Sequence, residues 1–244
     1  VKESIQKPKY YLDNNIKSTL SLLECMFEEN IFKLIFSSSA TLYETSQPLP
    51  LKETSKIDFN KNPYGKSKYI IEQILEEIVN SDRRWVIRIA RYFNPISNHS
   101  SGIIKENSKN IPDNLIPSIV KVAQKKLPYL KIFGNNYLTK DGTCIRDYIH
   151  VMDLAYGHVA LLKKSKLKKG FKIYNFGTGK GYSVLDVVNK FEKETKINIP
   201  IKFVRRRKGD TAASYCNTSK ALKELNWKSQ YTLKKAIIDL KKTI

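Results

Sequence analysis

The sequence predicts an α/β fold in which helices cover a parallel sheet. Helical and strand-like patterns alternate along the chain, which is typical of parallel strands joined by helical crossovers. The chain has 244 residues and 41% hydrophobic content, so it can bury one large core or two small ones. No internal repeat is apparent.

Apolar spacing assigns each element in turn. The elements expected before residue 91 are a helix with the stripe Ile16, Leu20, Leu23 and Phe27, a strand over 32–37, a helix over 64–79 and a strand over 85–90. Residues 94–114 are rich in Asn, Ser and Pro and show no periodicity, so we expect a long functional loop that enters a second lobe. The elements expected beyond it are helices near 115–126, 153–164, 219–225 and 232–242, and strands near 129–133, 171–176 and 199–204.

The formal net charge of +21 raises the question of a polyanionic partner. Lysines dominate and are dispersed over the predicted helices, and only Arg205–Lys208 forms a dense basic block. No basic stripe interleaved with aromatic residues, of the kind that stacks bases, is visible. We therefore interpret the charge as a solvated surface and expect no nucleic-acid partner; a polyanion patch is the alternative.

Hydropathy and cysteine usage limit the cellular setting. No apolar stretch reaches the roughly 18 to 20 residues of a membrane span, so no membrane partner is expected. The three cysteines, Cys25, Cys144 and Cys216, are odd in number and lack metal-ligand spacing. Reduced thiols in a cytoplasmic protein without a metal are the simplest account.

Tyr64 and Lys68 lie four residues apart at the start of a predicted helix and therefore share one face. A phenol titrates near pH ~10, and a base near neutrality needs that value lowered by roughly 3 units, to which an ammonium one turn away can contribute. Such a pair also occurs on ordinary surface helices. The serine run Ser37–Ser39 favours chemistry, because it follows a predicted strand, and ligands bind at the carboxyl ends of strands in open α/β sheets.

These residues, with others in the same order, make the sequence similar to the extended short-chain dehydrogenase/reductases, which use a Ser or Thr and Y-x-x-x-K. Within that family the similarity is greatest to enzymes that invert C4 of UDP-hexoses rather than to the dehydratases or decarboxylases. The runs that carry it are Glu3–Pro8, Asp13–Asn15, Ser37–Tyr43, Pro63–Lys68, Arg91–Pro95, Ile111–Leu115, Ile132–Asn135, Asp141–Thr143, Arg146–Ala155 and Gly209–Asp210. They span nearly the whole chain.

The resemblance implies a Rossmann-like sheet with a smaller C-terminal lobe. Residues 1–94 would be the C-terminal part of the NAD-binding domain and 95–244 mainly the UDP-sugar-binding lobe, with 171–190 returning to the first domain. It also implies galactose metabolism by interconversion of UDP-glucose and UDP-galactose through a 4-keto sugar, and a homodimer formed by helices at 16–29 and 64–79.

The resemblance further assigns roles to residues at the nicotinamide half of NAD. Asn14, Ser39, Tyr64, Lys68 and Phe93 would face it, with Ser39 bonding the C4 oxygen and Tyr64 acting as base. Lys68 would bond the nicotinamide ribose and keep the tyrosine pKa low. Without the resemblance, Asn14 would be a helix cap and Phe93 a core aromatic.

Residues later in the chain would hold the UDP-hexose. The implied contacts are Asn94, Asn114 and Leu115 to sugar and diphosphate, Arg146 and Arg207 to diphosphate, Ile132 and Phe133 to uracil, Asp210 to ribose, and Ser214 to the sugar's C2 substituent. A small residue at Ser214 would admit N-acetyl sugars, unless Tyr215 closes the pocket. On residue type alone, Arg146 and Asp147 would form a surface ion pair, Asn114 a helix cap, and His150 a buried hydrogen-bonded histidine.

The family's glycine-rich dinucleotide fingerprint does not occur in this sequence. The run Gly177–Gly181 fits neither G-x-G-x-x-G nor the P-loop and is expected to be a turn before a capping-box helix that starts at Ser183. We therefore expect an incomplete sheet that lacks its first βαβ units, a missing C-terminal tail, and no turnover by this chain alone. A related nucleotide-sugar epimerase, such as one acting on UDP-glucuronate, and an inactive relic or basic binding protein are the alternatives.

Overall fold

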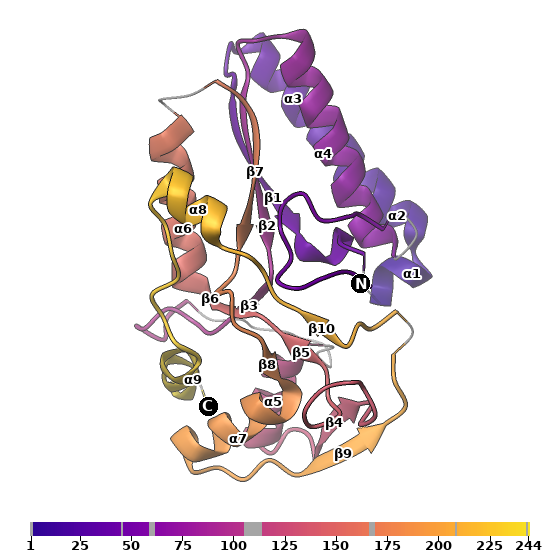
Figure 1. Ribbon diagram of the computed structural model, residues 1–244, viewed down its shortest axis with the longest axis vertical. Coiled ribbons are helices and arrows are strands. Elements are labelled where there is room, and N and C mark those ends of the chain that lie inside the picture. The colour runs from indigo at the N-terminus through magenta and orange to yellow at the C-terminus, as the bar shows by residue number, and fades with distance from the viewer. Residues whose placement is uncertain are drawn as a thin grey trace. The chain divides into compact units, whose positions relative to one another are not determined.

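The computed structural model describes residues 2–44, 46–58, 62–104, 114–165, 169–207, 209–242 and 244. Its elements confirm the α/β class, and its sheets contain mainly parallel strand pairs. The chain divides into two compact units, each described here by itself (Figure 1). Unit 1 comprises residues 1–93, 157–176 and 217–227, and unit 2 comprises 94–156, 177–216 and 228–244.

Unit 1 contains a three-stranded parallel sheet in the order β1-β2-β7. Its elements are α1 (Lys2–Gln6), α2 (Pro8–Leu12), the π-helix η1 (Asp13–Lys17), α3 (Ser18–Glu28), β1 (Lys33–Ser39), the 3-10 helix η2 (Ala40–Leu42), α4 (Pro63–Ser81), β2 (Val86–Tyr92), β7 (Gly170–Phe176), α8 (Ser219–Leu225) and the second half of α6 (Val151–Ser165). In Figure 1, α3 and α4 lie along one side of this sheet, and α6 and α8 lie on the other.

The core of unit 1 fills the space between α3, α4 and the sheet. It is formed by Leu23, Met26, Ile71, Leu75, Val79, Trp85, Ile87 and Ile89. The expected apolar stripe of the first helix is partly wrong, because Leu20 and Phe27 are 40% and 55% exposed, and Leu23 with Met26 form the buried face. Phe27 instead packs edge-on against Phe32 at 6.2 Å between ring centroids, under the Arg84 guanidinium.

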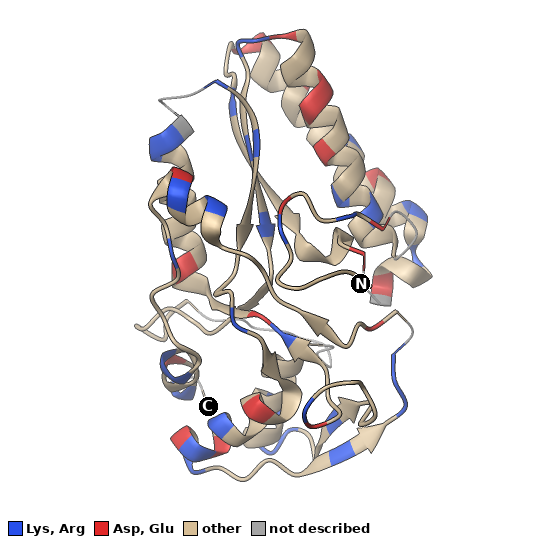
Figure 2. Ribbon diagram, in the orientation of Figure 1, with Lys and Arg blue, Asp and Glu red and all other residues tan. Residues whose placement is uncertain are grey.

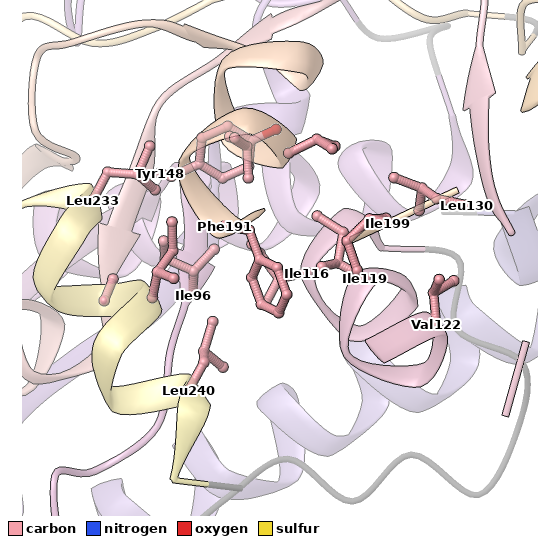
Figure 3. Packing of buried hydrophobic residues seen from close by; sticks show 14 of the residues in the cluster. Ile96, Ile116, Ile119, Val122, Leu130, Tyr148, Phe191, Ile199, Leu233 and Leu240 are labelled. Atoms are coloured by element: carbon pink, nitrogen blue, oxygen red, sulfur yellow. The ribbon is translucent and has the colours of Figure 1, made fainter. Parts of the chain in front are cut away.

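Unit 2 is built from shorter strands around a helical core. Its elements are β3 (Asn94–Ile96), α5 (Leu115–Ala123), β4 (Leu130–Phe133), β5 (Ile145–Arg146), β6 (Tyr148–His150), the first part of α6, β8 (Tyr182–Ser183), α7 (Val184–Thr195), β9 (Ile201–Val204), β10 (Ala213–Ser214) and α9 (Leu233–Lys241). They form the sheet β10-β5-β8 and the parallel pairs β3-β6 and β4-β9. Figure 3 shows Phe191 at the centre of side chains from α5, α9 and the strands.

Three of the sequence expectations concern loops and helix starts. The first three residues of the expected loop 94–114 form β3, because they pair with β6; the run Ile111–Asp113 and Lys208 lie outside the described residues. The segment 171–190, expected to return to the first domain, divides between the units: residues up to Phe176 belong to unit 1, where β7 pairs with β2, and residues from Gly177 belong to unit 2. The capping box at Ser183 is confirmed, with Ser183 and Asp186 each accepting the other's backbone N–H.

Candidate active site

Tyr64 lies in the first turn of α4, and several hydrogen bonds fix its backbone. Asn62 caps the helix by accepting the Gly65 N–H at 2.7 Å. The Tyr64 N–H donates to Ser4 Oγ at 3.3 Å, and Ser67 Oγ donates to the Tyr64 carbonyl at 2.8 Å. Because these hydrogen bonds fix the backbone on both sides of Tyr64, its side chain starts from a defined position on α4.

Ser39 and Tyr64 come together in the structure. Ser39 ends β1, two residues later than the expected strand end, and its hydroxyl accepts the Thr41 N–H at 3.2 Å and the Thr41 hydroxyl at 2.9 Å. A side chain at Gly65 would lie 3.3 Å from the Thr41 carbonyl, so glycine permits the close approach of α4 to this turn. Burial raises the pKa of Tyr64, and a hydrogen bond with Ser39 opposes that rise.

Lys68 lies one helical turn from Tyr64, and the expected lowering of the Tyr64 pKa by Lys68 stays a prediction. Its ammonium donates to the Ser37 carbonyl at 3.0 Å, 4.7 Å from the Phe36 ring centroid and 5.9 Å from that of Tyr64. Burial lowers the pKa of Lys68 itself. Among the described residues its ammonium makes one hydrogen bond, so two of its three donors remain for a ligand.

Asn14 and Phe93 occupy different settings. Asn14 is exposed in the π-helix η1, inside a continuous helical run, so the helix-cap alternative is wrong. Its neighbour Asn15 donates to Ser67 at 2.9 Å, which ties η1 to α4 one turn from Tyr64. Phe93 is 5% exposed and packs against Tyr43 at 6.4 Å, as the core-aromatic alternative requires.

A buried polar network under this site was not visible in the sequence. Arg91 and Glu72, 3% and 1% exposed, form a two-pronged ion pair at 3.1 and 2.5 Å. Arg91 also donates to the Tyr43 hydroxyl at 3.0 Å, which donates to Asn175 Oδ1 at 2.6 Å, while Ser38 donates to Glu72. Burial works against the charge of Arg91, but its bonds to Glu72 prevail and raise its pKa. The sequence does not indicate this burial, because the residues of the network are polar types that are ordinarily exposed.

In unit 2, several residues assigned to the nucleotide lie in pairs. Arg146 Nη2 lies 3.6 Å from Asp210 Oδ1, although 64 positions separate them. The Arg207 guanidinium lies over the Phe133 ring at 3.8 Å from its centroid. In the β5–β10 pairing, Arg146 stands opposite Ser214. The expected Arg146–Asp147 ion pair is wrong, because Asp147 is fully buried.

Other assigned residues in unit 2 are less directly placed. Ile132 is 1% exposed within the core, so only its backbone can meet a ligand, while the next residue, Phe133, is half-buried. Asn114 stands at the N-cap of α5 without a side-chain capping bond, and Leu115 packs against the core. His150 is buried, 3.3 Å from Asp239, which confirms its interpretation as a hydrogen-bonded core histidine.

Surface properties add little to the site. Figure 2 shows Lys and Arg dispersed along both units, with acidic residues among them. None of the described helices is long and apolar enough to span a membrane. All three cysteines are free thiols, with Cys25 exposed and the other two buried.

Comparison with known proteins identifies the class first. The sequence profile of the family described as GDP-mannose 4,6 dehydratase matches residues 1–240, and the chain belongs to this family of α/β nucleotide-sugar enzymes.

Its curated relatives are UDP-glucose 4-epimerases: that of Bos taurus is 48% identical over 98% of this chain, which spans 69% of the relative. The solved UDP-glucose 4-epimerase of Bifidobacterium longum, in complex with NAD+ and UDP, is 46% identical with a TM-score of 0.94, covering 99% of this chain and 72% of that one. The Stenotrophomonas maltophila enzyme, with bound NAD and formylated UDP-arabinopyranose, is 39% identical with a TM-score of 0.97, covering 100% and 72%.

Proposed function

We propose that this chain carries the C4 epimerisation that interconverts UDP-glucose and UDP-galactose with NAD as cofactor. The single observation that carries the proposal is the joining of Ser39, Tyr64 and Lys68 at the carboxyl end of β1, in a chain whose relatives are UDP-glucose 4-epimerases. Each site residue expected from the sequence has a role in this proposal.

The residues present fit the nicotinamide half of NAD. Lys68 offers two donors beyond its bond to Ser37, which suits the paired hydroxyls of a ribose, and Asn14 presents an exposed amide on the neighbouring π-helix. When bound, NAD would take up and return the hydride of C4, and its positive ring would favour the Tyr64 phenolate. Phe93 would support this region through its packing on Tyr43.

Proton transfer is the task of Tyr64. Its phenolate would accept the proton of the 4-hydroxyl, while Ser39, already bonded to Tyr64, would hold the C4 oxygen. After the sugar has turned and C4 has regained the hydride on its other face, Tyr64 would give a proton back to the C4 oxygen. Because burial alone raises the pKa of Tyr64, this base requires an added positive charge at the site.

The nucleotide would be held by unit 2. Arg146 and Arg207 have planar guanidinium groups that suit a diphosphate, and both now lie against partners, Asp210 and Phe133, that would themselves meet ribose and uracil. Asn94, Asn114 and Leu115 would contact sugar and diphosphate, and the Ile132 backbone would face the base. A tight grip on the nucleotide leaves the hexose free to turn.

The test uses this chain joined to the segment of the bovine relative that the match leaves uncovered, here called the completed enzyme. With UDP-galactose, proton NMR should show UDP-glucose appearing until a constant ratio is reached. The bovine segment alone is the control and should show no conversion. A folded, NAD-binding completed enzyme that converts neither sugar would overturn the proposal.

Ser214 favours a second substrate class. Tyr215, the alternative residue for closing this pocket, packs against Gly181, where an added Cβ would lie 3.0 Å from its ring. We propose that the small Ser214 side chain leaves room for an N-acetyl group. The completed enzyme should convert UDP-N-acetylgalactosamine within roughly a hundredfold of UDP-galactose. Ser214→Tyr should suppress only the former, and equal loss of both would contradict this assignment.

Partners and location are proposals of the same kind. Exposed Leu20, Leu22 and Phe27 on α3 support a homodimer through this helix, which sedimentation of the completed enzyme would test. The free thiols of Cys144 and Cys216 support a reducing, cytoplasmic setting. The dispersed Lys and Arg residues in Figure 2 support the proposal that no nucleic acid is bound.

A further inference from the structure

Asp147 occupies the junction between two strand systems of unit 2. It lies between β5 and β6 and is 0% exposed. Its backbone N–H donates to the Ser214 carbonyl at 3.1 Å, and its carbonyl accepts the Asn94 N–H at 2.9 Å. The residue that precedes it is Arg146. One peptide segment therefore joins three residues of the proposed nucleotide-sugar site.

The Asp147 carboxylate accepts five hydrogen bonds from neutral donors. Oδ1 accepts the N–H and hydroxyl of Thr178 at 2.8 and 2.7 Å. Oδ2 accepts the Gly179 N–H at 2.9 Å, and the N–H and thiol of Cys216, both at 3.3 Å. Hydrogen bonds to an ionised acceptor are roughly twice as strong as neutral ones, so this group holds its surroundings firmly.

The run Gly177–Gly181, which matched no phosphate-binding motif, has a function in this arrangement. A Cβ at Gly177 would lie 2.6 Å from Asp147 Oδ2 and 2.5 Å from Cys216 Sγ. Only glycine lets the backbone pass this close to the carboxylate. The run then leads into β8, where Tyr182 pairs with Arg146, so the same loop reaches the other edge of β5.

We infer that Asp147 is a positioning residue, which fixes Asn94, Arg146 and Ser214 in one frame and thereby sets the affinity for the nucleotide sugar. This inference rests on the proposed function. The Asp147 side chain is buried and its carboxylate oxygens are engaged with protein donors, so we assign it an indirect role. Asp147 acts through β5, because it holds the segments that pair with both edges of that strand. Binding groups displaced by about 1 Å lose much of their effect.

The test measures UDP binding by calorimetry with the 244-residue chain, well below the melting temperature of each variant. Asp147→Asn keeps the volume but turns an amide NH₂ toward N–H donors, and the dissociation constant should rise at least tenfold. Thr178→Val deletes one hydroxyl donor at nearly constant volume and should raise it about threefold. Asp153→Asn is the matched control: Asp153 is also 0% exposed in unit 2 and accepts the Gln230 and Tyr231 N–H groups. Its UDP affinity should not change.

Melting curves separate positioning from stability. A residue that only stabilised the fold would lower the melting temperature and leave the UDP affinity of the folded chain unchanged. Unchanged affinity in Asp147→Asn, or in Thr178→Val should the former not fold, would overturn the inference alone. Equal weakening by Asp153→Asn would overturn it as well. If the wild-type chain bound no UDP, the proposed function would fail together with the inference.

Discussion

The two units of this protein place their site residues by different means. In unit 1, Tyr64 and Lys68 are one turn apart on α4, and Ser39 ends a seven-residue strand, so regular elements fix the proposed reacting groups. In unit 2, Arg146 and Ser214 lie on strands of two residues each, which cannot hold themselves in place. Buried carboxylates perform that task there. The proposed catalysis would thus depend on local spacing, whereas the proposed nucleotide binding would depend on tertiary hydrogen bonds.

The ion pairs of the two units show a second, different contrast. The Arg91–Glu72 pair of unit 1 is removed from water, while the Arg146–Asp210 pair of unit 2 has side chains 16% and 30% exposed at a longer 3.6 Å. A buried pair penalises the loss of either partner heavily, whereas a solvated pair contributes little. In unit 1 we therefore expect substitutions in the buried Arg91–Glu72 pair to lower the free energy of unfolding most.

The largest expected effect concerns catalysis in unit 1. Tyr64→Phe in the completed enzyme keeps the ring but deletes the ionisable oxygen, so kcat should fall by about 10²–10⁴, or about 3–5 kcal/mol of barrier. UDP affinity should stay near that of the wild type, because unit 2 would hold the nucleotide. Steady-state kinetics with calorimetry measures both, and near-normal turnover would refute the role of Tyr64.

Next in size is the loss of the buried ion pair. Glu72→Ala leaves Arg91 charged and unpaired, which should lower the free energy of unfolding by about 3–5 kcal/mol in urea titrations. The double variant Glu72→Leu with Arg91→Met removes both charges and should be more stable than the single one. A single variant as stable as the wild type would contradict the account of this network.

A smaller effect is expected for acid stability in unit 2. Asp141 accepts the Thr143 N–H and hydroxyl at 2.9 and 2.8 Å, and the Ser183 hydroxyl. Burial raises the pKa of Asp141, but these bonds outweigh it, and the net shift is downward. Its contribution is therefore fully present above the unfolded value of about 3.9 and is lost as the pH falls through the lower folded value.

Urea titrations of Asp141→Asn and the wild type at pH 7 and below pH 4 measure this contribution. The difference between them should be on the order of 1 kcal/mol at pH 7, because the site is partly solvated, and should shrink in acid. A difference that grew as the pH fell would contradict the assigned direction of the shift.

The smallest effect is expected for the partly exposed Arg146–Asp210 pair of unit 2. Asp210→Asn should change the free energy of unfolding by less than about 1 kcal/mol, because water screens the Arg146–Asp210 contact. Raising the salt concentration should change the wild-type and variant stabilities alike. A loss as large as that of Glu72→Ala would remove the contrast between the units.

Sequence reasoning was most accurate where structure is local. Helix α8 has the predicted bounds 219–225, α4 begins one residue before the predicted start, and the capping box at Ser183 formed as predicted. These features depend on spacing within a few residues. The short strands β5, β8 and β10 went unpredicted, because two residues carry no periodicity and the strands exist only through their partners.

The burial of polar residues was the other feature that the sequence did not predict. Asp147 was expected at the surface beside Arg146, since residue type favours exposure for an aspartate. Its burial depends on donors supplied by Thr178, Gly179 and Cys216, which lie 31 to 69 positions away. The glycines of the 177–181 run are the signal that the sequence offers. They indicate that the backbone passes close to another group, but they do not identify that group.

The measurement that tests the central claim most directly follows the hydrogen at C4. UDP-galactose labelled with deuterium at C4 is given to the completed enzyme in ordinary water, and the product is examined by deuterium and proton NMR. Epimerisation through a 4-keto sugar, with Tyr64 handling only the hydroxyl proton, predicts UDP-glucose that keeps deuterium at C4. Replacement of the label by solvent hydrogen, or label retained in unchanged UDP-galactose alone, would contradict the account.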